Sequence, residues 1–331
     1  MSGEMPTVGE FFAAWELFRD PTLTGTLAGA MLGALGVYVV LRRMVFLAAA
    51  VSQAASFGVA GAYFLTLNAA WAVGTWVPTL GALAMTFITL GIVASDTSHE
   101  HHRRDALLGF VFLTCSAGTL ALGTRIVQEI QDIESVLFGT AVAVLPEDFL
   151  LVGVLSMVVL AVQVWGWRGF TAVSFDRTGA IVRGLPVRGL ELALFVGLAV
   201  ALAVCTRVLG ALPTFAFSVL PALAAVNLAP NVRTCLLLAA GFGAASGFGG
   251  YLLAFVFELP VGGCLLLVRS FVAALFLQPA LCVVALTVAP PEFGLDCTLT
   301  SDRFSPMLRR PCLTLALPPL LPIAEGGVLA V

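Results

Sequence analysis

Apolar residues follow one another along this chain in about nine long blocks, separated by short polar or charged segments. A helix rises about 1.5 Å per residue, so roughly 20 apolar residues cross a hydrocarbon core of about 30 Å. Blocks of this length predict membrane spans at 22–41, 45–67, 71–94, 106–124, 149–166, 189–209, 211–228, 234–257 and 261–288. The pattern therefore predicts an all-α polytopic membrane protein built as a bundle of about nine transmembrane helices.

Composition supports this prediction. Hydrophobic residues make up 60% of the chain and charged residues 11%, with a mean hydropathy of +1.05. Soluble domains carry about 25% charged residues. We therefore expect a multi-pass protein of the cell membrane, the inner or plasma membrane. The N-terminal segment is polar and acidic up to Asp20, so no cleaved signal peptide is expected.

Arginines indicate the orientation, since loops on the cytoplasmic side are enriched in basic residues. With the N-terminus outside and the C-terminus inside, two arginines lie in outer segments (Arg19 and Arg125) and two within spans (Arg207 and Arg269). The twelve in cytoplasmic segments are Arg42, Arg43, Arg103, Arg104, Arg168, Arg177, Arg183, Arg188, Arg233, Arg303, Arg309 and Arg310.

Three regions follow along the chain. Residues 1–20 form an extracytoplasmic N-terminal segment, and 21–289 form the transmembrane domain. Prolines recur from Pro290 onward and break any long helix, so 290–331 is expected to be an irregular or disordered cytoplasmic tail.

Residue content excludes several kinds of chemistry. All 16 basic residues are arginine, so the chain lacks the lysine that a phosphate-binding loop places on its nucleotide. No Ser/His, Cys/His or paired-carboxylate arrangement recurs within the spans, so we do not expect an enzyme. No cofactor bound by this chain and no nucleic-acid partner are expected, and any ATP is hydrolysed by another subunit.

A short charged segment, 172–184, connects two of the spans on the cytoplasmic side. It is ended by Gly184 and Pro186, which are typical of a helix end. The residues alone leave two interpretations: a short ordered helix against which another subunit could push, or an ordinary connecting loop.

Six strings, in order, resemble the permease subunits of the zinc/manganese (metal ion) family of ABC importers. They are GALGVYVVLRRMVFLAAAVSQAASFGVA (33–60), RRDALLGFVF (103–112), VLFGTAVAVLPEDF (136–149), SFDRTGAIVRGLPVRGLELAL (174–194), VLGALPTFAFSVLPALAAVNLA (208–229) and ELPVGGCLLLV (258–268).

The resemblance implies partners and a coupling element. It implies a cytoplasmic ABC ATPase, an extracytoplasmic substrate-binding protein and a second permease copy, with a homodimer expected, all surrounded by membrane lipid. It also implies that residues 173–184 are the coupling helix that seats in the ATPase. Its expected contacts are Phe175, Asp176, Arg177 and Arg183.

The chain departs from this family where a metal ion would bind. The family carries Asp and His four residues apart in its second span, and the matching residues are Ala49 and Gln53; a further Asp is Thr140 here. Candidate pathway residues are therefore Ser52, Gln53, Ser56 and Thr140. The serines and Gln53 could instead form hydrogen bonds between helices.

The three histidines of the chain, His99, His101 and His102, lie together before the fourth span. Imidazoles suit zinc, which makes them weak candidates for receiving a released ion. A solvated polar loop is the other interpretation, because adjacent histidines on a loop lack groups that orient them.

The sequence thus favours the permease subunit of an ABC importer, best matched to a divalent metal ion such as zinc or manganese. Two alternatives stay open: a permease of this architecture with a changed substrate, and a non-transporting paralogue or assembly partner.

Overall fold

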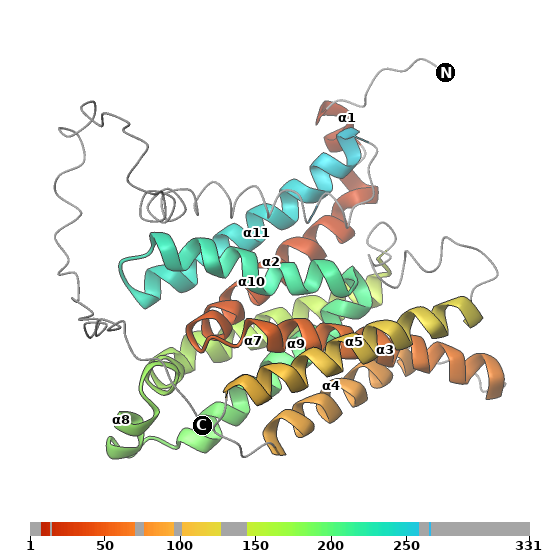
Figure 1. Ribbon diagram of the computed structural model, residues 1–331. Helices are drawn as coiled ribbons and strands as arrows, with labels where there is room; N and C mark the ends of the chain where they lie inside the picture. The colour runs from red at the N-terminus through yellow and green to blue at the C-terminus, as the bar shows by residue number, and fades with distance from the viewer. Residues whose placement is uncertain are drawn as a thin grey trace, which may run out of the picture. The chain divides into compact units, whose positions relative to one another are not determined.

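The computed structural model describes residues 8–13, 15–69, 76–95, 101–126, 144–257 and 265, and every regular element in them is an α-helix. The helices are α1 (Val8–Ala13), α2 (Trp15–Leu41), α3 (Val45–Ala69), α4 (Val77–Ser95), α5 (His101–Ile126), α7 (Pro146–Phe175), α8 (Arg177–Val182), α9 (Val187–Leu209), α10 (Ala211–Leu228) and α11 (Val232–Phe257) (Figure 1).

Seven helices are long and apolar enough to cross a membrane: α2, α3, α5, α7, α9, α10 and α11. Helix α4 contains a shorter apolar stretch, Val77–Val93. The prediction of an all-α, multi-pass membrane protein is confirmed. Apart from Leu265, the ninth predicted span, 261–288, lies outside the described residues, as does the whole predicted tail, 290–331.

Helices α2 and α7 extend furthest beyond the spans predicted from apolar residues. Helix α2 begins at Trp15, so the predicted boundary after residue 20 falls inside a helix. Aromatic packing explains this, because the rings of Phe11 and Phe18 lie 5.4 and 5.1 Å from the ring of Phe255 in α11. Helix α7 continues to Phe175. The polar residues that flank an apolar block therefore continue the helix, although they are expected to lie outside the hydrocarbon core.

Helices α2 and α11 lie side by side and run antiparallel (Figure 1). Gly29 faces Gly243 so closely that a Cβ on either would overlap with the other's carbonyl group. One turn further along α2, Gly33 faces Ala239, one turn earlier on α11. Since lipid gives no hydrophobic drive between helices, backbones that approach over glycine make this packing favourable.

Contacts between helix ends show which ends lie together. Arg42, just after α2, donates from Nε to the hydroxyl of Ser174 at the end of α7, at 3.1 Å. It also pairs with Glu191 at the start of α9. The antiparallel pairing brings the start of α11, with Arg233, to the same end. Ends with arginine-rich connections therefore cluster at one end of the bundle, called here the arginine-rich end. Its cytoplasmic placement stays a prediction.

The core lies where α2, α3, α9 and α10 meet. Its fully buried side chains include Met31, Leu32, Leu202 and Phe217. Helices α5 and α7 lie further out, and Leu113 and Met157 on them are 67% and 65% exposed. Such apolar faces suit lipid or another membrane subunit.

Candidate functional site

A stripe of polar side chains on α3 is buried inside the bundle. Ser52, Gln53 and Ser56 are 1%, 4% and 1% exposed. The hydroxyl of Ser52 donates to the carbonyl oxygen of Ala48 at 2.8 Å, within the same helix. The amide oxygen of Gln53 and the hydroxyl of Ser56 have no hydrogen-bond partner among the described residues.

These contacts bear on the two interpretations of the stripe. Hydrogen bonds between helices would need partners on neighbouring helices, but the Ser52 bond stays within α3. For the Gln53 oxygen and the Ser56 hydroxyl, no described neighbour supplies a partner. A buried polar group without a partner costs about 1–3 kcal/mol. The two groups are thus suited to bind water or a passing ligand, and their role in transport stays a prediction.

Helix α3 also presents Ala49, one turn before Gln53 and 6% exposed. Residues four apart share one helix face, so this face is neutral where the resembling family carries Asp and His. Among the described side chains, no group of three His, Cys, Asp or Glu residues could hold a metal ion. The face can offer amide and hydroxyl oxygens only.

The other predicted ion-binding residues are His99, His101, His102 and Thr140. His101 and His102 begin α5, so part of the predicted loop is helical. His99 and Thr140 lie outside the described residues.

An ion pair lies at the end of the bundle opposite the arginine-rich end. Arg207, in the last turn of α9, lies 3.1 Å from the carboxylate of Asp148 in the first turn of α7. Both side chains are 15% exposed. Arg207 also donates to the hydroxyl of Thr79 at the start of α4. Three helices are therefore joined by one guanidinium.

A second charged cluster lies at the arginine-rich end, around Glu191 of α9. Its carboxylate lies 3.7 Å from Arg42 and 3.2 Å from Arg177. The guanidinium of Arg42 lies over the ring of Phe195, 5.4 Å from its centroid. With the Arg42–Ser174 bond, the cluster connects α2, α7, α8 and α9.

Helix α8 confirms that the segment 172–184 is ordered, although its helix proper is shorter. Asp176 lies at its N-cap and accepts a hydrogen bond from the backbone N–H of Gly179 at 2.9 Å. Ala180 is 2% exposed and packs against Val173 and Val187, which anchors the helix. The helix ends before Gly184, whose φ of +73° favours glycine.

Large apolar side chains are exposed in this anchored helix and just before it. Phe175, Ile181 and Val182 are 63%, 60% and 84% exposed. Of the four predicted contacts, Asp176 caps α8 and Arg177 pairs with Glu191, so both have local structural roles. Sequence reasoning missed Ile181 and Val182; their apolar character within a charged segment was the signal that could have identified them.

Sequence reasoning also missed both charged clusters. It placed Arg207 inside a span without a partner, and Asp148 directly precedes the predicted span 149–166. The signal was present, because the predicted alternation of spans puts these opposite charges at the same end of the bundle.

Comparisons with known proteins agree with this arrangement. The model of the ABC 3 transport family matches residues 14–279. The chain is 28% identical over 257 residues to the chelated iron transport system membrane protein YfeC of Yersinia pestis, covering 76% of this chain and 83% of that protein. It is 26% identical over 268 residues to the manganese transport system membrane protein MntC of Listeria monocytogenes, covering 79% and 91%.

The fold is similar to that of a solved structure. The structure of PsaBC from Streptococcus pneumoniae in complex with Fab matches with a TM-score of 0.71 and 20% identity. The match covers 84% of this chain and all (100%) of that one. At 20% sequence identity, this similarity establishes a shared fold and nothing more.

Proposed function

The chain belongs to the ABC 3 transport family, and we propose that it is the permease subunit of an ATP-driven importer for a divalent metal ion. Relatives named as manganese and chelated-iron transport proteins support a metal as the substrate. Zinc and manganese are the ions that the sequence resemblance favours. The proposed complex contains this chain, a second copy of it, a cytoplasmic ATPase and an extracytoplasmic binding protein.

Helix α8 is the single observation that carries the proposal. It is short, capped by Asp176 and anchored by Ala180, and it lies at the arginine-rich end of the bundle. Ile181 and Val182 project from it and are suited to bury apolar surface in a groove of an ATPase. An exposed but firmly anchored helix is what a motor subunit needs in order to move a membrane domain.

Glu191 supports a path for this motion. Displacement of α8 acts on Arg177, and Glu191 joins Arg177 to Arg42 at the end of α2. Helix α2 packs along most of its length against other helices, including α11 through Gly29. The ion-pair cluster is therefore suited to transmit movement of α8 into the bundle.

The buried stripe of α3 is the proposed ion path. Carbonyl and hydroxyl oxygens suit hard cations such as Mn²⁺, whereas Zn²⁺ prefers nitrogen and sulfur ligands. The neutral pair Ala49 and Gln53 also supports a second candidate, a permease of the same architecture whose substrate is no longer a bare metal ion.

Uptake of radiolabelled zinc and manganese tests the proposal. Cells would express this chain together with its ATPase and binding protein, and the control would carry an inactivated ATPase. Accumulation of either ion that requires the active ATPase would support metal import. If the complex assembles and neither ion accumulates, import of zinc and of manganese is refuted, and the changed-substrate or non-transporting alternative holds.

A variant of α8 tests the coupling element separately. Val182→Asp places a charge on the exposed apolar surface and is expected to reduce co-purification of the ATPase at least tenfold. Arg188→Gln, on an exposed residue of α9 near α8, is the matched control. Equal ATPase retention in both variants would remove α8 from the proposed interface.

A further inference from the structure

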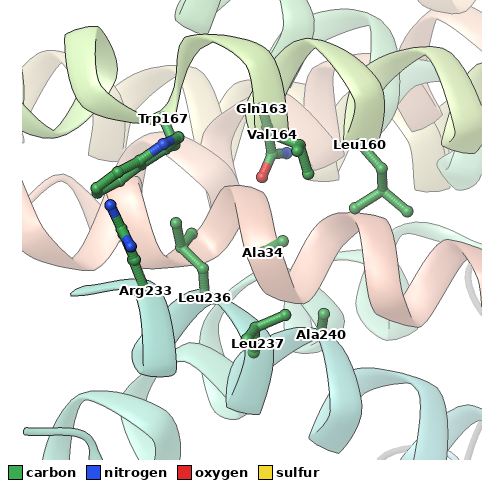
Figure 2. A pocket seen from close by; sticks show the side chains of 9 residues that line it. All are labelled: Ala34, Leu160, Gln163, Val164, Trp167, Arg233, Leu236, Leu237 and Ala240. Atoms are coloured by element: carbon green, nitrogen blue, oxygen red, sulfur yellow. The ribbon is translucent and has the colours of Figure 1, made fainter. Parts of the chain in front are cut away.

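A groove of about 420 Å³ lies between α2, α7 and α11 (Figure 2), and its lining residues include none of the α3 stripe. Its apolar part is formed by Leu160 and Val164 of α7 and by Leu236 and Leu237 of α11. Val164 and Leu237 are 74% and 73% exposed, so the groove opens onto the outer surface of the bundle. An opening of this kind faces the space that lipid chains occupy.

Positive charge gathers at one end of the groove. The guanidinium of Arg233 lies along the face of Trp167, 4.2 Å from the ring centroid (Figure 2). Arg168 lies 5.7 Å from the centroid of the same indole. Among the described residues, the ion pairs are formed by other arginines, Arg42, Arg177 and Arg207. Arg233 lines this end of the groove, and Arg168 lies next to it on the same indole without lining the groove; no described carboxylate pairs with either guanidinium.

The length of α7 places this charged end at the membrane surface. The segment from Asp148 to Arg168 rises about 30 Å, which is the thickness of the hydrocarbon core. Tryptophan prefers the headgroup level, and Trp165 (91% exposed) and Trp167 lie there. From Arg233 to Ala240 the groove runs about 10 Å, most of the depth of one leaflet.

A buried amide lies one helical turn deeper than the charged end. Gln163 precedes Trp167 by about one turn, lines the groove and is 5% exposed. Its amide nitrogen has no hydrogen-bond acceptor among the described residues. One turn is about 5 Å, the order of separation between the phosphate of a phospholipid and its glycerol esters.

We propose that this groove binds one anionic phospholipid of the leaflet at the arginine-rich end. Arg233 and Arg168 contact the phosphate, and the Gln163 amide donates to an ester carbonyl. One acyl chain lies along Leu160, Val164 and Leu236. The predicted orientation makes this the cytoplasmic leaflet, where basic pockets between helices bind anionic headgroups. The proposal does not depend on the transported substrate.

Lipid titration of the full-length chain in detergent tests the proposal. The probes are dioleoyl phosphatidylglycerol and dioleoyl phosphatidylcholine, and native mass spectrometry counts the bound molecules. Each arginine near an anionic headgroup contributes about 1 kcal/mol, so Arg233→Gln is expected to weaken phosphatidylglycerol binding about fivefold. Arg168→Gln added to it is expected to weaken binding about 25-fold. Phosphatidylcholine binding should change little.

Two further variants separate charge from shape. Arg188→Gln removes an exposed arginine at the same end of the bundle but away from the groove, and it should leave binding unchanged. Ala240→Phe fills the apolar part and should reduce binding while both guanidiniums remain. Equal binding of the two lipids by the wild-type chain, or an equal loss in Arg188→Gln, would overturn the proposal.

Two alternative occupants give distinct results. A benzophenone amino acid in place of Val164 is expected to cross-link to phospholipid in the assembled complex. A cross-link between two copies of the chain would instead identify this face as a subunit interface and overturn lipid binding. Displacement of phosphatidylglycerol by millimolar inorganic phosphate would assign the charged end to a free anion and would also overturn it.

Discussion

The Asp148–Arg207 ion pair makes a quantitative prediction about how α7 and α9 are held together. The charged atoms lie 3.1 Å apart, and each side chain is 15% exposed. At an effective dielectric constant of about 20, their attraction is about 5 kcal/mol before desolvation is subtracted. Removing one partner of such a pair costs about 3–5 kcal/mol, because the other charge stays buried without compensation.

In each single variant, a local contact partly stabilises the charge that is left unpaired. In Asp148→Asn, Arg207 keeps its hydrogen bond to Thr79, so we expect a loss of about 3 kcal/mol in the free energy of unfolding. In Arg207→Gln we expect about 2 kcal/mol, since the carboxylate lies near the helix N-terminus of α7, which favours negative charge. The double variant removes both charges and should lose only about 2 kcal/mol.

A double-mutant cycle measures the prediction. Unfolding of the full-length chain in mixed detergent micelles gives the free energy for each variant, with Arg188→Gln as the exposed control. The double variant should be about 3 kcal/mol more stable than the sum of the single losses implies. Losses that add to within about 0.5 kcal/mol would refute the ion pair as a link between α7 and α9.

Three other predictions concern the α8 element, the α3 stripe and helix packing. Asp176→Ala combined with Arg177→Ala removes the cap of α8 and the Arg177–Glu191 ion pair, and should weaken ATPase co-purification without unfolding the bundle. Unchanged co-purification would contradict the coupling role. Gln53→Ala should reduce uptake while the complex still assembles, and full uptake would leave only a packing role for this residue. Gly36→Ala should destabilise the chain by several kcal/mol in the same unfolding assay, because its Cβ would overlap with the Ser218 carbonyl; Gly61→Ala, with open space around it, should be neutral or slightly stabilising.

The helical bundle could be predicted because lipid imposes a local rule. A span must satisfy its own backbone hydrogen bonds and stay apolar for about 20 residues, and both conditions are visible in consecutive residues. The predicted spans 189–209 and 211–228 accordingly agree closely with α9 and α10. The signals for helix α8 are also local in the sequence. Asp176 accepts a hydrogen bond from Gly179, three residues later, and Gly184 follows the end of the helix.

The helix ends depended on contacts that apolar blocks do not encode. Helix α2 extends back to Trp15 because aromatic rings near its start pack against Phe255, far away in the sequence. Packing between residues far apart in the sequence does not change the local spacing of apolar residues, so that spacing cannot reveal it.

The functional arrangement was decided by tertiary structure. Arg207 meets Asp148, and Glu191 joins Arg42 to Arg177, through side chains up to about 150 residues apart. The groove that exposes Val164 beside Arg233 likewise exists only because α7 and α11 lie on either side of α2. The sequence by itself determined which residues enter the membrane, because transfer into lipid is a property of each segment. Which polar groups meet inside was left to the folded bundle, because pairing free energy depends on distance and burial, and these arise only when the helices pack.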